Sequence, residues 1–413
     1  MNRKQIVADA PPQRPGPEQP GPEQPGPERP GTVGPPQEAK AAQEAPAPPW
    51  TPRLAGDPET AARAFAISGK LAAATPYGSG HINDSYCAIF EHRSASTRYL
   101  LQRINHHIFK NPVALMENIQ RVTAHLGAQV ADDPDHDRRA LRLIPARAGG
   151  VLHVDADGSY WRAYQFIGNA TTYNSVQSPD QAFQAAKAFG EFQRMLADLP
   201  PPRLHHTIPD FHHTPKRFAA LEQAIASDVA GRAVGARPEI DFALARKSLT
   251  TRLVEAGLPE RVTHNDTKIN NVLLDDKTGE GTCVIDLDTV MPGLVAYDFG
   301  DMVRTATSLA PEDERDLNKV NMEFPLFEAL ARGYLSSAGG FLTPAEKESL
   351  AFAGKLITFE IGIRFLTDYL SGDTYFKVHR EGHNLDRCRA QFKLVQSIEF
   401  QEDQMAELIR SIG

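Results

Sequence analysis

The sequence has little cysteine, no long apolar run and no excess of positive charge, and each absence excludes a class of protein. Its three cysteines, Cys87, Cys283 and Cys388, lie far apart with no CxxC pair, which argues against a disulfide framework and a structural zinc site. No apolar stretch approaches the ~18 residues of a membrane-spanning helix, so we expect no membrane partner. The formal net charge of −8 argues against a nucleic-acid partner. The N-terminus has no apolar segment of the kind that a secretory signal carries, so we expect a cytoplasmic protein.

Proline is concentrated at the start of the chain, where the first 50 of 413 residues hold 14 of the 32 prolines. Residues 16–30 read GPEQP-GPEQP-GPERP, and the prolines of each unit fix φ and remove backbone donors, which excludes helix and sheet. We therefore predict a disordered, extended tail over residues 1–50. The remainder has ordinary composition and is long enough to form two lobes.

Residues 51–168 are predicted to form a β-rich N-lobe. Strand-like patterns cover 77–104, 141–144, 151–154 and 161–167, with Asp157-Gly158 as a turn. Between them, Asn111-Pro112 reads as a helix start, and apolar residues then recur every three or four positions up to Leu126.

Residues 169–413 are predicted to form a larger, α-rich C-lobe. Ser178-Pro179-Asp180-Gln181 is a capping-box start for a strong helix, and helical patterns return over 215–257, 346–371 and 387–410. A small island of short strands interrupts them at 262–290. The order predicts a two-lobed α+β protein.

The chemistry-bearing residues gather within 262–304, in the segment VTHNDTKINNVLLDDKTGEGTCVIDLDTVMPGLVAYDFGDMVR. Asp266 follows His264 by two positions, and Asn271 opens a short strand whose expected antiparallel partner ends at Asp286. Such a hairpin brings Asn271 and Asp286 to one edge. Phosphoryl transfer needs a carboxylate at the attacking hydroxyl and oxygen ligands that hold Mg²⁺ on the phosphates. Asp266 suits the first role, and Asn271 with Asp286 the second.

This segment resembles the catalytic and metal-binding loops of the aminoglycoside phosphotransferase and choline kinase superfamily, which has a protein-kinase-like fold. Within the superfamily, the closer resemblance is to bacterial N-acetylhexosamine 1-kinases. It is carried by the segments HNDTKINNVLLD, VIDLDTVMPG and YDFGD, by LLQRIN–FKNPVALMENI upstream, and by IRFLTDYLSGDTYFKVHREGHNLDR downstream. The similarity runs over most of residues 70–400. The catalytic block is highly specific for a kinase, whereas the sugar assignment is less specific.

The resemblance implies ATP and Mg²⁺ as cofactors and a role for each matching position. Asp266 would be the catalytic base, and His264 would brace the catalytic loop. Asn271 and Asp286 would bind Mg²⁺, and Asp288 would be an additional metal contact or a supporting one. Short Asx-turns would explain an isolated HxD with a later Asn, but not this motif followed by a hairpin.

The nucleotide site is expected at the turn Gly78-Ser79-Gly80, followed by Asn83, because glycines let backbone N–H groups approach phosphate oxygens. Kinases of this superfamily place a lysine on the third strand, but here that strand reads Tyr99-Leu100-Leu101-Gln102-Arg103. Either Arg103 supplies the charge, paired with Glu117 on the next helix, or Gln102 takes the position with a neutral amide.

The acceptor site is the least determined part of the sequence. Acids and bases are balanced over 360–389, which suits a neutral polyol better than a polycationic aminoglycoside. The candidate acceptor residues are His212, Asp298, Asp301, Arg304, Arg364 and Asp368, although helix-start acids and ion pairs spaced by four would also explain several of them. A transition-metal site at His205, His206, His212 and His213 is disfavoured, because the segment lacks cysteine and helical spacing.

The favoured function is an ATP-dependent small-molecule kinase that phosphorylates the anomeric hydroxyl of N-acetylglucosamine or N-acetylgalactosamine. The alternatives are an amino-alcohol or aminoglycoside kinase, and a nucleotide-binding pseudokinase that acts as a partner protein. Intact Asp266, Asn271 and Asp286 argue against the pseudokinase, while the missing strand lysine argues mildly for it. No obligate protein partner is evident.

Overall fold

The computed structural model of the chain describes residues 56–78, 80 and 82–413. The predicted tail over residues 1–50 and Ser79 of the glycine-containing turn lie outside these residues. We call residues 56–168 the N-lobe and residues 169–413 the C-lobe. No helix in the described part of the chain is both long and apolar enough to cross a membrane.

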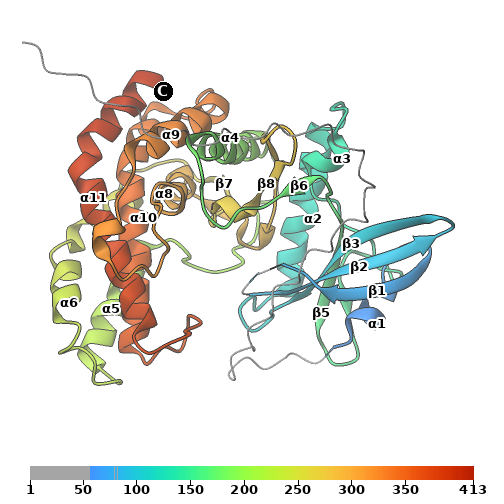
Figure 1. Cartoon of the computed structure of the whole chain (residues 1–413), viewed down its shortest axis with the longest axis horizontal. Coiled ribbons are helices and arrows are strands. Elements are labelled where there is room, and N and C mark those ends of the chain that lie inside the picture. Colours follow the sequence, from blue (N-terminus) through green and yellow to red (C-terminus); the bar gives the residue numbers. More distant parts are fainter. Residues whose placement is uncertain (1–55, 79, 81) are drawn as a thin grey trace, which may run out of the picture. The chain divides into compact units, whose positions relative to one another are not determined.

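The N-lobe is built on a five-stranded antiparallel sheet with the order β1-β2-β3-β5-β4 (Figure 1). Its strands are β1 (Lys70–Pro76), β2 (Asp84–His92), β3 (Ala95–Ile104), β4 (His153–Val154) and β5 (Tyr160–Gln165). Helix α1 (Pro58–Arg63) packs against β1, and a small core that includes Phe65, Leu101 and Trp161 lies on this outer face. The helices α2 (Pro112–Gln129) and α3 (His136–Arg139) follow β3 in the chain.

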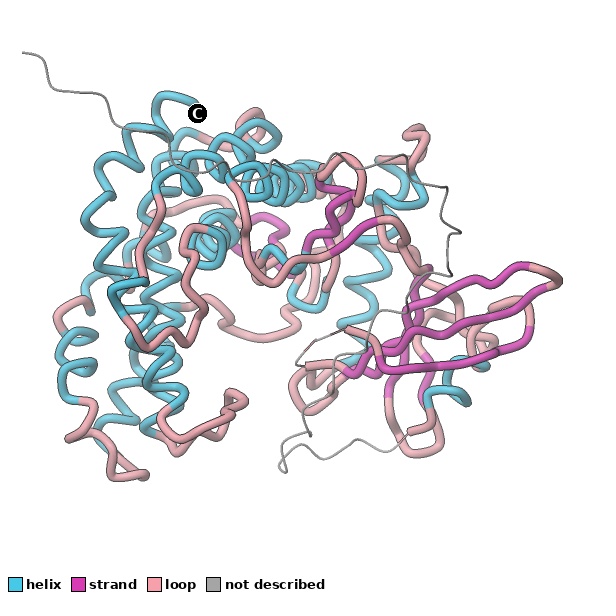
Figure 2. The backbone as a smooth tube through the Cα atoms, in the orientation of Figure 1, coloured by secondary structure: helices cyan, strands magenta, loops and turns pink. Residues whose placement is uncertain are grey.

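The C-lobe is mainly helical, with two small sheets inserted (Figure 2). Its helices are α4 (Pro179–Met195), α5 (Thr214–Ser227), α6 (Arg237–Leu244), α7 (Arg252–Glu255), α8 (Val295–Ala306), α9 (Phe324–Ala338), α10 (Pro344–Leu370) and α11 (His383–Ile412). Its strands are β6 (Ala170–Thr171), β7 (Arg261–Thr263), β8 (Val272–Asp275), β9 (Gly281–Val284) and β10 (Met291–Gly293). Helices α4 and α9 pack together, as do α10 and α11.

The two lobes share one apolar core along α2. Leu115, Ile119 and Val122 on the buried face of α2 belong to the same cluster as Phe189 on α4 and Val272 on β8. Because this core is continuous, it fixes the β8–β9 hairpin relative to the N-lobe sheet. The loops that carry Asp266 and Asp286 flank that hairpin in the chain, before β8 and after β9.

The structure confirms the predicted two-lobed α+β architecture and most helix starts. Asn111 Oδ1 accepts the amide of Ala114 at 3.1 Å, and Ser178 Oγ accepts that of Gln181 at 3.2 Å. The strand prediction for 141–144 is wrong, because that segment forms only a single bridge between Leu143 and Tyr164 beside β5. Pro145 follows directly and has no amide donor to continue a ladder. The first strand also begins earlier than predicted, at Lys70.

Candidate active site

The loop between β7 and β8 carries Asp266, and Asp298 on α8 holds its backbone in place. The Asp298 carboxylate accepts the amides of His264 at 2.8 Å and of Asn265 at 2.6 Å, while the Asp298 carbonyl accepts the Thr267 hydroxyl at 2.6 Å. Asn265 has a φ of 65°, a left-handed conformation that such anchoring stabilises. Asp298 is fully buried, so its role is to shape this loop rather than to touch an acceptor.

His264 braces the same loop, as the resemblance implied. Its Nδ1 accepts the Asp266 amide at 3.3 Å, so its Nε2 carries the proton and donates to the Ile285 carbonyl at 2.9 Å. The ring lies edge-on to Phe189 and Phe192. His264 therefore ties Asp266 to the segment that precedes Asp286.

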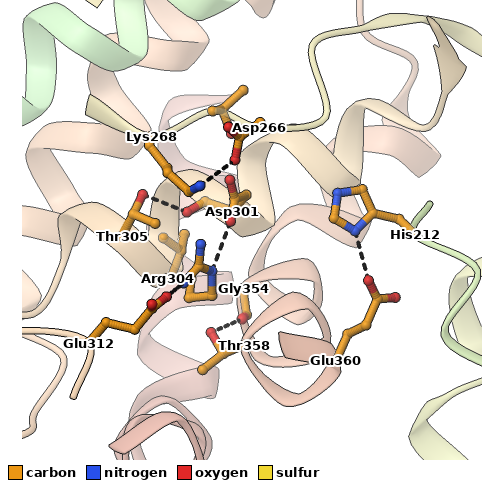
Figure 3. Close-up of polar contacts among 12 residues, drawn as sticks. His212, Asp266, Lys268, Asp301, Arg304, Thr305, Glu312, Gly354, Thr358 and Glu360 are labelled. Atoms are coloured by element: carbon orange, nitrogen blue, oxygen red, sulfur yellow. Dashed lines mark hydrogen bonds and ion pairs between the residues drawn. The ribbon is translucent and has the colours of Figure 1, made fainter. Parts of the chain in front are cut away.

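Asp266 lies between two donors within the C-lobe (Figure 3). Its Oδ1 is 2.8 Å from Lys268 Nζ, and its Oδ2 accepts a hydrogen bond from the side-chain Nδ2 of Asn271 at 3.1 Å. Burial acts to raise the pKa of Asp266, but the charge and hydrogen bond of Lys268 outweigh it and the pKa is lowered. The carboxylate is therefore ionised at neutral pH and can accept a proton.

The β8–β9 hairpin brings Asn271 and Asp286 together as the sequence predicted. Val272 pairs with Val284, and the Ile285 amide donates to the Asn271 carbonyl at 2.9 Å. Within the described chain, no hydrogen bond engages Asn271 Oδ1 or the Asp286 carboxylate. Burial, then Asp288 and Asp266, raise the pKa of Asp286 to about 6, although water still reaches its side chain. Neighbouring negative charges destabilise the ionised Asp286 carboxylate, and a bound cation would relieve this repulsion, so Asp286 is a suitable cation ligand.

These residues fit Mg²⁺, because the free oxygens are an amide and a carboxylate, which a hard cation prefers. No group of three or more His, Cys, Asp or Glu side chains in the described part of the chain could hold a metal alone. A cation bound by Asn271 and Asp286 would therefore need phosphate oxygens and water to complete its coordination.

Asp288 has a different environment from the one predicted for a metal contact. It is buried, and its two carboxylate oxygens accept hydrogen bonds from Arg162 on β5 and from Asn83. Both partners belong to the N-lobe. Asp288 thus links the lobes beside Asp286, and only its supporting role agrees with this geometry.

The predicted ion pair between Arg103 and Glu117 is wrong. Arg103 Nε is 3.1 Å from Asp84 Oδ2, on the outer side of the sheet, and Glu117 Oε2 is 2.7 Å from His205 Nε2. Gln102 is the residue of β3 that faces inward, and it lies opposite Arg162 in the sheet register. Arg162, which the sequence reasoning missed, supplies the buried cation from the neighbouring strand.

Gly78 has open space beside it among the residues that the structure describes. It has a φ of 80°, which favours glycine, and a Cβ there would meet no described atom within 4 Å. Asn83 Oδ1 accepts the Asn105 amide at 2.9 Å, which fixes the end of this turn against β3. Because both ends of the Asn83 side chain are bonded within the protein, Asn83 is a support here and not a nucleotide contact, and a nucleotide contact at Gly78 and Gly80 stays a prediction.

Most of the predicted acceptor residues are already bonded to the protein. His212 Nδ1 lies 2.8 Å from Glu360 (Figure 3), and its Nε2 lies 3.0 Å from the Asn265 carbonyl. Arg304 Nε donates to Asp301 at 2.8 Å. These buried groups support the catalytic loop and the helices beneath it, not a direct acceptor contact.

Asp368 organises a loop above α10 instead of facing a ligand. Its carboxylate accepts the amides of Thr374, Tyr375 and Phe376 at 2.8–2.9 Å. Arg364, one turn earlier, lies near the rings of Phe211, Tyr375 and Phe376, with no carboxylate partner among the described residues. Of the six candidates, Arg364 alone presents a free polar head group.

Lys268 is the second residue that the sequence reasoning missed. It stands two positions after Asp266 in the motif, and the charges of Asp266 and Asp301 raise its pKa against the effect of burial. A lysine next to the catalytic carboxylate was visible in the sequence, but only the fold shows that its side chain turns back toward Asp266.

Comparisons with known proteins identify the family. A model of the phosphotransferase enzyme family matches residues 73–333, so the chain belongs to that family. An aminoglycoside phosphotransferase from Alicyclobacillus acidocaldarius superposes with a TM-score of 0.56 at 13% identity, covering 87% of this chain and 98% of that one. A microcompartment-associated aminopropanol kinase gives 0.53 at 16% identity, covering 84% and 97%. A spectinomycin phosphotransferase, solved with ADP and spectinomycin, gives 0.50 at 12% identity, covering 81% and 94%. At these identities the similarity establishes the fold.

Proposed function

We propose that the protein is an ATP- and Mg²⁺-dependent kinase that phosphorylates the anomeric hydroxyl of an N-acetylhexosamine. The observation that carries the kinase assignment is the free pair of oxygens on Asn271 and Asp286, held by the hairpin beside the ionised Asp266. The solved spectinomycin phosphotransferase, which carries ADP, supports a nucleotide as the donor. Bound Mg²⁺ would supply charge neutralisation on the nucleotide phosphates.

Asp266 would orient the acceptor hydroxyl and take its proton as the oxygen attacks the terminal phosphorus. Among the described residues, its Oδ2 accepts one long hydrogen bond, from the Asn271 side chain, so a lone pair remains for this proton. Lys268 lies on the other oxygen, where its positive charge stabilises the phosphoryl oxygens during transfer. Asp298 and His264 keep the carboxylate in place.

The charges around the site favour a neutral acceptor. Asp301 and Glu312 both bind Arg304, and Glu360 binds His212, so these acids are already compensated. A polycationic aminoglycoside would need uncompensated acids. Arg364 offers hydrogen-bond donors, and the rings of Phe211 and Tyr375 offer flat apolar surfaces. Proteins bind sugars through these two kinds of group. The N-acetylhexosamine itself is favoured by the resemblance of the catalytic block.

The direct test is an ADP-release assay with N-acetylglucosamine, N-acetylgalactosamine, amino alcohols and aminoglycosides as acceptors. We expect turnover with an N-acetylhexosamine and a sugar 1-phosphate by phosphorus NMR. Asp266→Asn should lower turnover roughly 10²–10⁴-fold while Mg·ATP binding persists. Turnover with amino alcohols or aminoglycosides alone would refute the sugar assignment, and nucleotide binding without any turnover would support the pseudokinase.

Arg364→Met tests the acceptor wall. We expect the acceptor KM to rise roughly 10- to 100-fold, as for one or two lost charge-assisted hydrogen bonds. Arg252→Met is the matched control, since Arg252 also lies over a ring, that of Phe352 at 4.1 Å, and forms no ion pair within the described part of the chain. An equal effect of both variants would remove Arg364 from the acceptor site.

A further inference from the structure

The segment that carries Asp286 is tied to the N-lobe through Asp288. Arg162 and Asp288 form an ion pair with side chains 1% and 4% exposed, and Asn83 donates to the second carboxylate oxygen. Asn83 stands directly before β2, whereas Asp288 stands two residues after Asp286. A displacement of Asn83 would therefore displace the segment that carries Asp286, and the reverse also holds.

Both N-lobe partners are fixed from behind. Arg162 Nε donates to Gln102 Oε1 at 3.0 Å, and Gln102 Nε2 donates to Ser85 Oγ at 3.0 Å. Asn83 Oδ1 accepts the Asn105 amide at 2.9 Å. Three neighbouring strands or their ends thus hold the two groups that grip Asp288, so the contact has little freedom to adjust locally.

Arg162 is placed for holding a carboxylate rather than a phosphate. Burial lowers its pKa, but the negative charge of Asp288 and the hydrogen bond to it outweigh this and the pKa is raised. Its guanidinium is almost without exposed surface, because Asp288 and Gln102 cover it. A nucleotide phosphate would have to displace Asp288 to reach it.

We propose that Arg162 and Asn83 form a latch with Asp288 that couples nucleotide binding by the N-lobe to cation binding at Asp286. Arg162 and Asn83 are positioning residues in this scheme, because they act through Asp288. The inference rests on the proposed function in one respect, namely that this protein binds a nucleotide and Mg²⁺. Coupling between two sites is reciprocal, so Mg²⁺ must strengthen nucleotide binding by the factor by which nucleotide strengthens Mg²⁺ binding.

The test is calorimetric titration of the full chain with ADP, with and without MgCl₂. We expect Mg²⁺ to tighten ADP binding to the wild type by at least about fivefold, the lower end of typical couplings. Arg162→Gln and Asn83→Ala should bring that factor close to one while Mg²⁺-free ADP affinity changes less than about threefold. Arg162→Lys should restore part of the factor, since lysine keeps the charge but not the forked geometry.

The matched control is Arg138→Gln. Arg138 also ties the lobes, by donating to Asp275 at the other end of β8 and to the Asn169 carbonyl, both at 2.7 Å. It should leave the Mg²⁺ factor at the wild-type value. If Arg162→Gln does not fold, Asn83→Ala decides, because Asn83 is only half-buried and leaves the ion pair in place.

Three results would overturn the latch. An unchanged Mg²⁺ factor in Asn83→Ala and Arg162→Gln would show that Asp288 does not transmit the coupling. If Arg162→Gln weakens ADP binding without Mg²⁺ as much as it does with Mg²⁺, Arg162 is a nucleotide contact instead. A wild type that binds ADP without any Mg²⁺ effect would overturn the proposed metal site and the latch together.

Discussion

The buried pair of His212 and Glu360 offers the clearest test of what holds the catalytic loop in place. His212 Nδ1 faces Glu360 Oε1 at 2.8 Å, and Nε2 faces the Asn265 carbonyl at 3.0 Å. Both partners are acceptors, so the geometry calls for an imidazolium that donates twice. Burial lowers the pKa of His212, but the charge and hydrogen bond of Glu360 outweigh it and the pKa is raised.

His212→Gln leaves the Glu360 carboxylate buried with the Thr214 hydroxyl at 2.6 Å as its remaining close donor. Removing one partner of a buried ion pair costs about 3–5 kcal/mol. Because glutamine still donates one hydrogen bond, we expect a loss near 3 kcal/mol. At roughly 2 °C per kcal/mol for a chain of this size, the melting temperature should fall by about 6 °C.

The effect should depend on pH with a defined sign. The folded pKa of His212 lies above its usual value, so its contribution is complete below pH ~6.5 and is lost as the pH rises through the folded pKa. The folded pKa of Glu360 lies below its usual value, because His212 outweighs burial, so its contribution is lost as the pH falls through that pKa. The difference between wild type and variant should therefore be greatest between about pH 4.5 and 6.5.

The assay is calorimetric melting of both proteins from pH 4.5 to 9, with His125→Gln as the control. His125 also contacts an acid, Asp198 at 3.0 Å, but that carboxylate is 71% exposed. The control should cost no more than about 1 kcal/mol. A His212→Gln variant that melts like this control, with no pH dependence, would refute a charged His212 in the folded protein.

Three further predictions follow from contacts around the site. Gly300→Ala should lower the free energy of unfolding in urea by about 1–3 kcal/mol, because the new Cβ would lie 2.5 Å from a carbonyl oxygen of α10. Gly127→Ala is its control and should stabilise the protein slightly, because the new Cβ would meet no described atom beyond its own helix within 4 Å. Asp298→Asn should lower turnover at least tenfold with nucleotide affinity retained, because the amide nitrogen would replace one of the two oxygens that each accept a backbone amide and would face that donor; unchanged turnover would refute its role. Lys268→Met should raise the pKa of Asp266, so the acid limb of the kcat profile should move to higher pH, and an unmoved limb would count against their contact.

The fold and the short-range part of the site could be predicted from the sequence because both depend on local spacing. Helix starts at Asn111 and Ser178 carry their own capping groups, and the hairpin that joins Asn271 to Asp286 needs only two short strands and a turn. The strand prediction at 141–144 is wrong because apolar character alone does not reveal a neighbour that supplies only one bridge.

The acceptor residues were harder, since sequence shows which polar groups exist but not which are already bonded. Asp298 satisfies the backbone at His264 and Asn265, and Asp368 satisfies three amides of a loop that follows it. Such partners lie many residues away or on the main chain. A polar side chain in a suggestive motif is therefore as often the support of a site as its contact surface.

The missing strand lysine shows the same limit at a single position. Side chains alternate across a strand, so Gln102 and Arg103 must face opposite sides of β3. Leu101 and Arg103 face the outer core with Trp161, which leaves Gln102 on the opposite face of the sheet, beside Arg162. The inward cation then comes from Arg162, directly opposite Gln102 on β5. Strand order, which no local pattern in the sequence encodes, decides which strand delivers the charge. A search for the lysine on β3 alone would miss this cation, which lies one strand away and holds Asp288 rather than a phosphate.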